Sequence, residues 1–258
     1  MNYHYQKVNP LLSEYIRTVL ILEDAPENNR NKLPLFTNGT PALLCRTQTT
    51  PEGIETISQL TLYGTSAPTA SWDITKNETL IAYFFKPFSM PCLFNISASE
   101  LVNKKVAFST WNAHKTNALK TQLAYSKSFA EKINALDNLL LGQLELQRKE
   151  CEIISRATDA ILLHSGKEIL TELLNDLNLT ERTFQRIFKK FVGITPTQYR
   201  RICQFKDSFE KLKSGAFEKM TDVAYQTGFA DQSHFIRSFK EHSQTTPGDY
   251  VKSGLRKK

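Results

Sequence analysis

The C-terminal half of this 258-residue chain contains an internal repeat, which constrains the fold more than any other feature of the sequence. The segment 182–201 matches the segment 233–252 at an offset of 51 residues. The matched identical residues are Phe184 and Phe235, Arg186 and Arg237, Phe188 and Phe239, Lys189 and Lys240, Thr195-Pro196 and Thr246-Pro247, and Tyr199 and Tyr250. We therefore expect two copies of one small structural unit in this half.

A second, shorter match precedes each copy and predicts a tight turn. In the first copy the apolar pair 173–174 is followed by Asn178, and in the second the pair 223–224 is followed by Gly228. A tight turn between two short helices needs a positive φ, which Gly adopts freely and Asn tolerates better than most residues. Each copy is therefore predicted to be a helix–turn–helix unit.

The second helix of the first unit is predicted from its apolar stripe. Phe184, Ile187, Phe188 and Phe191 recur at helical spacing and should form the buried face. Thr180 can cap the N-terminus of this helix, and Asp231 can do the same in the second unit.

One long helix is predicted between the two units. The segment 195–198, Thr-Pro-Thr-Gln, combines an N-cap, a Pro at the first helical position and a capping-box Gln. Its apolar side is formed by Tyr199, Ile202, Phe205, Phe209 and Leu212, and Gly215 suits its C-terminus. We expect this helix to hold the two units at a fixed separation.

The positive charge of the chain is confined to the same region. Residues 181–258 contain 16 Lys and Arg against 8 Asp and Glu, a net charge of +8. Residues 1–180 contain 17 against 18, a net charge of −1. A basic patch in one domain is typical of a nucleic-acid partner. Charge alone leaves open a solvated face with the basic tail 256–258.

The first 110 residues have a different pattern, with short β-rich runs separated by turn-forming residues. The expected strands are 16–22, 42–47, 57–63 and 79–86, and the expected turns are 24–26, 38–39, 51–53 and 64–68. Short strands at this spacing favour an antiparallel sandwich or barrel.

A leucine-rich amphipathic helix is predicted after the strands. Phe129, Ile133, Leu136, Leu140 and Leu144 recur at spacings of three and four residues. Two roles are open for this stripe: packing on its own β domain, or forming a seam between two copies of the chain.

Several classes of protein are disfavoured by the composition. No apolar run approaches the roughly 20 residues that a membrane span needs, and the polar segment 1–10 predicts no export signal. The four cysteines lack metal-ligand spacing and are expected to be reduced core thiols in a cytoplasmic protein. The five histidines form no metal-binding pattern. We therefore predict no catalytic residues, no metal and no cofactor.

Over about residues 150–252 the chain resembles the AraC/XylS family of bacterial transcription regulators. The residues that carry the resemblance are Arg182-Thr-Phe-Gln-Arg186, Gly193-Ile-Thr-Pro196, Asp222-Val-Ala-Tyr225, Gly228-Phe-Ala-Asp-Gln232, His234-Phe-Ile-Arg237 and Thr246-Pro247. The chain departs from the family at Asn178, where Gly is usual, and at Leu174, where Ala is preferred.

The resemblance implies an α+β protein of two domains. Residues 1–148 are expected to be an antiparallel β-barrel or sandwich-like regulatory domain with following helices, which senses a ligand, dimerises or does both. Residues 149–258 are expected to be an all-α DNA-binding domain with two helix–turn–helix units joined by a long helix. The implied partners are promoter DNA, an unknown small-molecule effector, RNA polymerase and a second copy of the chain.

In the first unit, five residues are expected to face DNA. Arg182, Gln185 and Arg186 lie on early exposed turns of the recognition helix and are assigned to base edges, because Arg pairs with guanine and Gln with adenine. Lys189 and Lys190 lie further along the helix and are assigned to phosphates.

In the second unit the corresponding residues are Gln232, Ser233, Ile236 and Arg237, with Lys240 as the counterpart of Lys189. Ile236 is expected to be exposed, and a thymine methyl group is a suitable partner for it.

Each assignment has a structural alternative. Arg186 and Arg237 can instead pair with nearby acids, and Gln185 can be an ordinary surface residue. His234 is expected to pack in the core, and Tyr199 and Tyr250 are expected to be structural.

Three other functions compete with a sequence-specific transcription regulator. A metal-dependent barrel enzyme lacks the paired histidines it would need. A DNA-repair alkyl acceptor needs clustered zinc-binding cysteines, whereas the cysteines here are dispersed. A small-molecule sensor that has lost DNA binding is disfavoured by the intact Arg and Gln faces.

Overall fold

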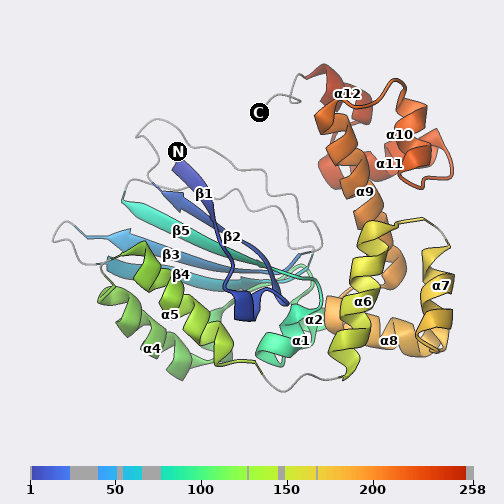
Figure 1. The fold of residues 1–258 in the computed structure, drawn as a ribbon. Coiled ribbons are helices and arrows are strands. Elements are labelled where there is room, and N and C mark those ends of the chain that lie inside the picture. Colours follow the sequence, from blue (N-terminus) through green and yellow to red (C-terminus); the bar gives the residue numbers. More distant parts are fainter. Residues whose placement is uncertain are drawn as a thin grey trace. The chain divides into compact units, whose positions relative to one another are not determined.

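The computed structural model describes residues 2–23, 40–50, 55–65, 77–126, 128–144, 149–166 and 168–253. The chain divides into two compact units. The first comprises Met1–Cys151 with Lys190–Gly193, and the second comprises Glu152–Lys189 with Ile194–Lys258. The strands lie in the first unit, and most of the helical repeat lies in the second (Figure 1).

An antiparallel sheet is the centre of the first unit. Its strand order is β1-β2-β5-β3-β4-β6. The strands are β1 (Asn2–Gln6), β2 (Ile16–Glu23), β3 (Ala42–Thr49), β4 (Glu55–Tyr63), β5 (Glu78–Phe85) and β6 (Lys105–Ala107). The four strands expected from the sequence are β2 to β5, so the antiparallel β-rich half is confirmed.

Two edge strands were not expected. β6 has only three residues, and β1 carries the exposed side chains of Tyr3 and Tyr5 rather than an apolar core face. The expected turns 24–26, 38–39 and 51–53 lie outside the described residues, as does most of 64–68.

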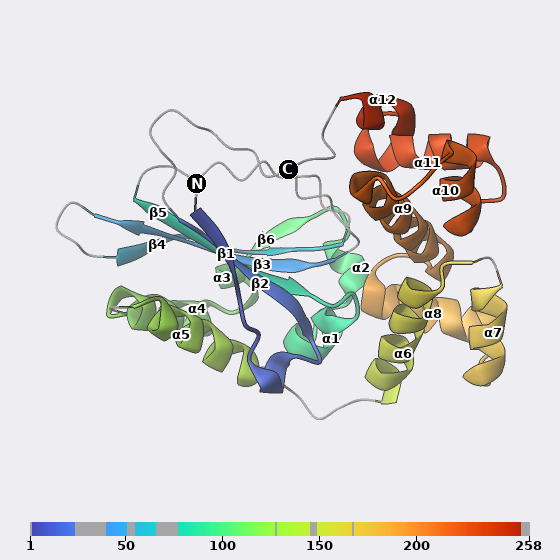
Figure 2. The same cartoon turned by 45° about the horizontal axis from the view of Figure 1, so that its top comes forward.

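The first unit also contains helices, some of which lie between its strands along the chain. They are η1 (Pro10–Leu12), α1 (Ser89–Phe94), α2 (Ala98–Leu101), α3 (Phe108–Trp111), α4 (Ala113–Ala124) and α5 (Phe129–Leu141). Helices α4 and α5 lie along the same side of the sheet, as both ribbon views show (Figure 2).

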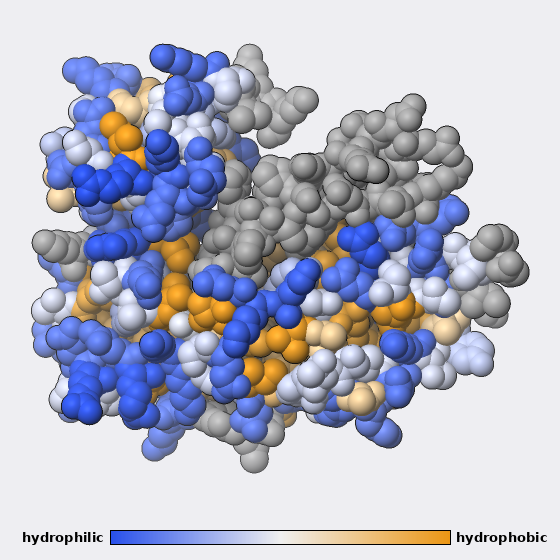
Figure 3. Space-filling model, turned by 180° about the vertical axis from the view of Figure 1, so that it is seen from behind, coloured by the Kyte–Doolittle hydropathy of each residue, from blue (hydrophilic) through white to orange (hydrophobic). Residues whose placement is uncertain are grey.

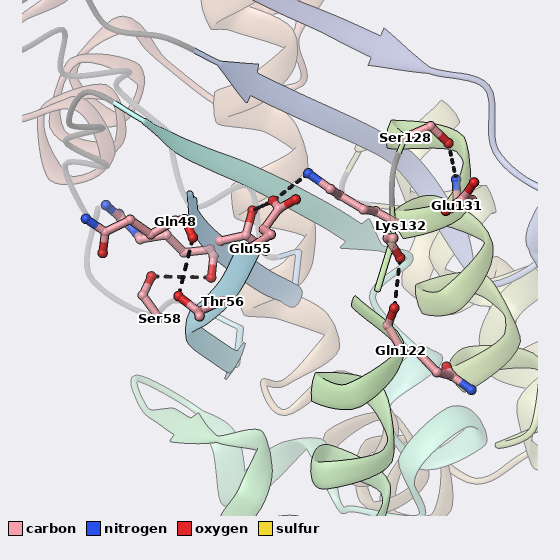
Figure 4. A network of polar contacts seen from close by, with 11 residues as sticks. Gln48, Glu55, Thr56, Ser58, Gln122, Ser128, Glu131 and Lys132 are labelled. Carbon is pink, nitrogen blue, oxygen red and sulfur yellow. Dashed lines mark hydrogen bonds and ion pairs between the residues drawn. The ribbon is translucent and has the colours of Figure 1, made fainter. Parts of the chain in front are cut away.

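Helix α5 is attached to the sheet by polar and apolar contacts. Lys132 points from α5 toward Glu55 on β4 and forms an ion pair with it (Figure 4). The hydroxyl of Tyr83 on β5 donates to Asp137 at 2.9 Å. Leu136 and Leu140 are fully buried. Leu136 and Leu140 therefore pack within their own domain and present no surface to a second copy, whereas Phe129 is 37% exposed. Helix α5 ends at Leu141, so Leu144 lies beyond it and the predicted extent of the stripe was wrong at that end.

The remaining helices form the C-terminal part. They are α6 (Lys149–Leu163), α7 (Ile169–Asp176), α8 (Glu181–Val192), α9 (Pro196–Ser214), α10 (Met220–Gln226), α11 (Gln232–Ser243) and α12 (Pro247–Lys252). Helices α7 and α8 form the first helix–turn–helix unit, α10 and α11 form the second, and α9 joins them. The α+β fold class with a long linking helix is confirmed.

The local geometry of the repeat agrees with the residues that predicted it. Asn178 has a φ of 50° and Gly228 a φ of 78°, so both turns use the left-handed conformation. The Thr195 hydroxyl and Gln198 side chain form a complete capping box at the start of α9. Gly215 ends α9 with a φ of 71°.

The cysteines differ from expectation. Cys92 and Cys151 form a disulfide within the first unit, whereas Cys45 and Cys203 are free and buried. The prediction of four reduced thiols was therefore wrong for one pair. Folding brings the two Cα atoms to 6.8 Å although 59 residues separate them, and spacing along the sequence cannot reveal such proximity.

Within the described ranges, no helix is long and apolar enough to cross a membrane. The same residues contain no group of three or more His, Cys, Asp and Glu side chains that could hold a metal ion.

Candidate nucleic-acid interface

Helix α8 separates a buried face from an exposed polar face. Its apolar stripe is fully or nearly fully buried, at Phe184, Ile187, Phe188 and Phe191. The residues at the opposite positions are exposed: Arg182, Gln185, Arg186 and Lys189. Since these four are spaced by three and four residues, they share one side of the helix. The structure therefore gathers four of the five expected residues of this unit on one surface.

The exposed groups of α8 differ in their hydrogen bonding. The Gln185 side chain donates to Glu181 one turn earlier at 2.8 Å, so it must exchange this bond to read a base. Among the residues that the structure describes, neither Arg182 nor Arg186 has an ion-pair partner. Within the described ranges, no acid competes with an external acceptor for these two guanidinium groups.

Lys190 stands apart from the other α8 residues. Its ammonium group pairs with Glu150 of α6 at 2.8 Å and lies 5.3 Å from the Phe191 ring centroid. Its side chain is 40% exposed. A phosphate contact would have to compete with this ion pair, so Lys190 is a weaker phosphate ligand than the neighbouring Lys189.

Helix α11 presents the corresponding surface of the second unit. Gln232, Ser233, Arg237 and Lys240 are exposed. Ile236 is 37% exposed, so its expected exposure is confirmed. Among the described residues no acid pairs with Arg237. The five residues expected from the sequence therefore all lie at the surface of α11.

The start of α11 is fixed by a side-chain cap. The Asp231 carboxylate accepts a hydrogen bond from the His234 backbone at 2.7 Å. The His234 ring packs against Phe229, with centroids 5.4 Å apart. His234 therefore packs at the turn, but it is half-buried and not part of the core that was expected to hold it.

An aromatic cluster holds α11 against α9. Its buried members are Phe205, Leu212, Val223, Ala224, Phe229, Phe235, Phe239 and Tyr250. The Tyr250 ring lies 4.9 Å from the Phe209 ring, and the Tyr199 ring lies 5.7 Å from the ring of Phe188 on α8. Both tyrosines are buried, so their expected structural role is confirmed. The recognition helices are thus supported by well-packed cores.

The outer surface of the helical unit is largely polar. Hydrophilic residues predominate on the face of this unit that Figure 3 displays. In the sequence, residues 181–258 have a net charge of +8. A polar, positively charged surface is the expected complement of a phosphate backbone.

Sequence reasoning missed two buried polar residues of α9. Arg200 is 8% exposed and Gln204 is completely buried. Their spacing, with Asp207, is i, i+4 and i+7, which places all three on one helix face. A polar stripe between the apolar residues of a linking helix was a signal that could have revealed them.

Comparison with known proteins supports this assignment of the C-terminal part. Residues 173–253 match the family model described as a helix-turn-helix domain. The chain is 36% identical over 70 residues to the probable transcription factor PqrA of Proteus vulgaris, covering 27% of this chain and 57% of that protein. It is 31% identical over 87 residues to the transcriptional activator RhaS of Citrobacter koseri, covering 33% of this chain and 31% of that protein.

The matches are partial, since the chain spans 31% and 57% of the lengths of these two relatives. Over the matched segment they confirm the resemblance to AraC/XylS regulators expected from the sequence. A crystal structure of ToxT from Vibrio cholerae overlaps 85% of this chain and 91% of its own, with 13% identity and a TM-score of 0.40.

Proposed function

We propose that this chain is a sequence-specific DNA-binding transcription regulator of the AraC/XylS type, because residues 173–253 match a helix-turn-helix family model. One observation carries the proposal. Two recognition helices expose equivalent arginines, Arg186 and Arg237, on the basic part of the chain, and neither has an ion-pair partner among the described residues. Such arginines suit the guanine edge in the major groove.

The two helices read one face of the duplex. Helix α9 has 19 residues and spans roughly 28 Å at 1.5 Å per residue. This length is comparable with the roughly 34 Å of one helical turn of DNA, so the two contacted sites lie about 10 bp apart in successive major grooves. Arg182, Gln185, Gln232, Ser233 and Ile236 contact bases beside the two arginines, and Lys189 and Lys240 contact phosphates.

The first compact unit, which contains the β-sheet, regulates the second compact unit, which contains most of the helical repeat. It is a folded unit outside the basic region, and the curated relatives that match the C-terminal part are named as transcriptional regulators. We assign to it an effector site, self-association or both, and to the whole chain a contact with RNA polymerase. A regulator of this class acts on the chromosome, which places the chain in the bacterial cytoplasm and gives it no catalytic role.

The test is selection of bound sequences from a random DNA pool by the full-length protein. The expected result is a bipartite motif whose two conserved parts are about 10 bp apart. Selection by a variant with both Arg186→Ala and Arg237→Ala is the control, and it should yield no such motif. The proposal is wrong if the unaltered protein enriches no motif at low salt, with cell extract added as a source of effector.

A further inference from the structure

Two loops of the helical unit contact the polar face of α9. One is the loop before α7, at Ser165 and Gly166. The other is the turn of the second helix–turn–helix unit, at Gly228. The Gln204 side chain donates from Nε2 to the carbonyl oxygen of Gly228 at 2.6 Å. The linking helix is therefore bonded directly to the backbone of the second turn.

The same face of α9 is hydrogen-bonded to the loop that precedes α7, the first helix of the first helix–turn–helix unit. Arg200 donates from a terminal guanidinium nitrogen to the Ser165 carbonyl oxygen at 3.1 Å. The Ser165 hydroxyl donates in turn to the Asp207 carboxylate at 3.3 Å. Burial raises the pKa of Asp207 above its usual value, although the Ser165 hydrogen bond, Lys206 and Lys211 oppose this effect.

The two loops also approach each other closely. A Cβ atom placed on Gly228 would lie 3.4 Å from the Gly166 Cα and 3.5 Å from the Ser165 carbonyl oxygen. The loop before α7 and the turn at Gly228 are therefore close together at this point. We refer to Ser165, Arg200, Gln204, Asp207 and Gly228 as the α9 hub.

The α9 hub is a costly way to stabilise a core. Within the described part of the chain, Arg200 Nε and Gln204 Oε1 are buried without a hydrogen-bond partner. An unsatisfied buried polar atom costs stability, whereas an apolar side chain of the same shape would cost little. Directional hydrogen bonds do, however, fix an orientation that apolar contacts leave free to slide.

We propose that the α9 hub locks the angle between the two recognition helices and thereby sets the half-site separation that the protein accepts on DNA. The inference rests on the proposed function for its DNA readout. Gln204 is the central positioning residue, because its amide joins the linking helix to the second turn. Arg200 and Asp207 join the linking helix to Ser165 in the loop before α7.

The experiment compares two variants of the full-length protein. Gln204→Met keeps the length of the side chain and removes its hydrogen bond to Gly228. Ser208→Ala is the matched control, because Ser208 is equally buried on α9 but its hydroxyl donates only to Phe205 of its own helix, at 2.7 Å. Arg200→Lys, which keeps the charge but loses the planar guanidinium, is an independent second test of the α9 hub.

Two readouts are measured on each protein. The first is affinity for the selected DNA site and for versions in which the two half-sites are one base pair closer or further apart. The second is the distance distribution between spin labels at Glu172→Cys and Tyr225→Cys, two exposed positions on α7 and α10. Thermal unfolding confirms that each variant is folded.

Gln204→Met and Arg200→Lys should reduce the preference for the correct separation by about fivefold or more, the effect of one mismatched base pair. Affinity for a single half-site should change by less than about twofold, as for a substitution away from the interface. The spin-label distances should broaden in these variants and not in Ser208→Ala.

The proposal is overturned if Gln204→Met and Arg200→Lys match Ser208→Ala in both readouts. If the unaltered protein binds no DNA, the proposed function fails. The spin-label distances alone then decide whether the α9 hub fixes the angle between the two recognition helices.

Discussion

Arg186 on α8 and Arg237 on α11 occupy the same position in the two recognition helices, each between two buried phenylalanines. Phe184 and Phe188 flank the first arginine, and Phe235 and Phe239 flank the second. Because the phenylalanines bury the inner face of each helix in the core, both arginines point outward. The repeat therefore presents one chemical group twice, at the two ends of α9.

Replacing either arginine should relax selectivity at a single base position. Arg186→Ala and Arg237→Ala are each expected to cost about 1–3 kcal/mol at the specific site, as for the loss of a bidentate guanine contact. The two relaxed positions should lie about 10 bp apart. Affinities for the specific site and its single-base variants test this. Equal losses on specific and random DNA would assign both arginines to the backbone, and neighbouring relaxed positions would refute the two-groove geometry.

Much of the repeat could be predicted because its requirements are local. A positive φ at Asn178 and Gly228, the Thr195 capping box and the apolar stripe of α8 each depend on a few neighbouring residues. The polar faces of α8 and α11 followed from the same helical period. The strands β2 to β5 could be predicted for a similar reason, since each is a continuous β-rich run.

The features that sequence reasoning missed depend on contacts between distant residues. The Cys92–Cys151 disulfide joins residues 59 positions apart, and the Lys190–Glu150 pair joins residues 40 apart. Gln204 resembles a surface residue of an amphipathic helix until the turn at Gly228 is packed against it. Edge strand β1 was missed because its Tyr3 and Tyr5 side chains are exposed, which leaves no buried apolar face to recognise.

Lys189 and Lys190 provide a matched pair of neighbouring cations. Lys189 is exposed, whereas Lys190 is already paired with Glu150. Lys189→Ala should weaken binding to all sequences alike and reduce the slope of log affinity against log salt by about 1. Lys190→Ala should reduce it by clearly less. Equal slopes for the two variants would mean that DNA displaces the Glu150 ion pair.

The two turn positions should differ in their sensitivity to side-chain changes. Gly228→Ala places a Cβ in a left-handed conformation, 3.1 Å from the Gln204 amide nitrogen, and should cost at least about 1–2 kcal/mol of stability. Asn178→Gly should be nearly neutral, because Gly adopts the same φ freely. Gly248→Ala is the control, since its added Cβ meets no atom closer than 3.9 Å. Denaturant unfolding measures all three, and a Gly228→Ala cost no greater than that of Gly248→Ala would contradict the prediction.

The disulfide makes a simple prediction about thiol content. Protein purified without reductant and then denatured should present two reactive thiols, Cys45 and Cys203. Cys92→Ser should raise the number to three by releasing Cys151. Titration with a thiol reagent counts them, and four thiols in the unaltered protein would show that the pair is reduced.

The buried carboxyl of Asp137 should make the stability of the first unit depend on pH. Burial raises its pKa above the ordinary value of 3.8, although the hydrogen bonds from Tyr83 and Asn9 partly oppose the shift. The folded chain therefore holds this proton more tightly than the unfolded chain. The stabilisation is complete below the ordinary pKa and is lost as the pH rises through the folded value. Asp137→Asn keeps an acceptor for Tyr83 and removes the charge.

Asp137→Asn should consequently unfold at a higher temperature than the unaltered protein at neutral pH, and the difference should shrink as the pH falls toward the ordinary pKa. Asp159→Asn, at an exposed position of α6, is the control for the general effect of removing one negative charge. Unfolding temperatures of the three proteins across the acid range test the prediction. A constant difference between Asp137→Asn and the unaltered protein at every pH would mean that Asp137 does not titrate differently in the folded chain. A lower unfolding temperature at neutral pH would mean that the charged form of Asp137 is the one that Tyr83 and Asn9 stabilise.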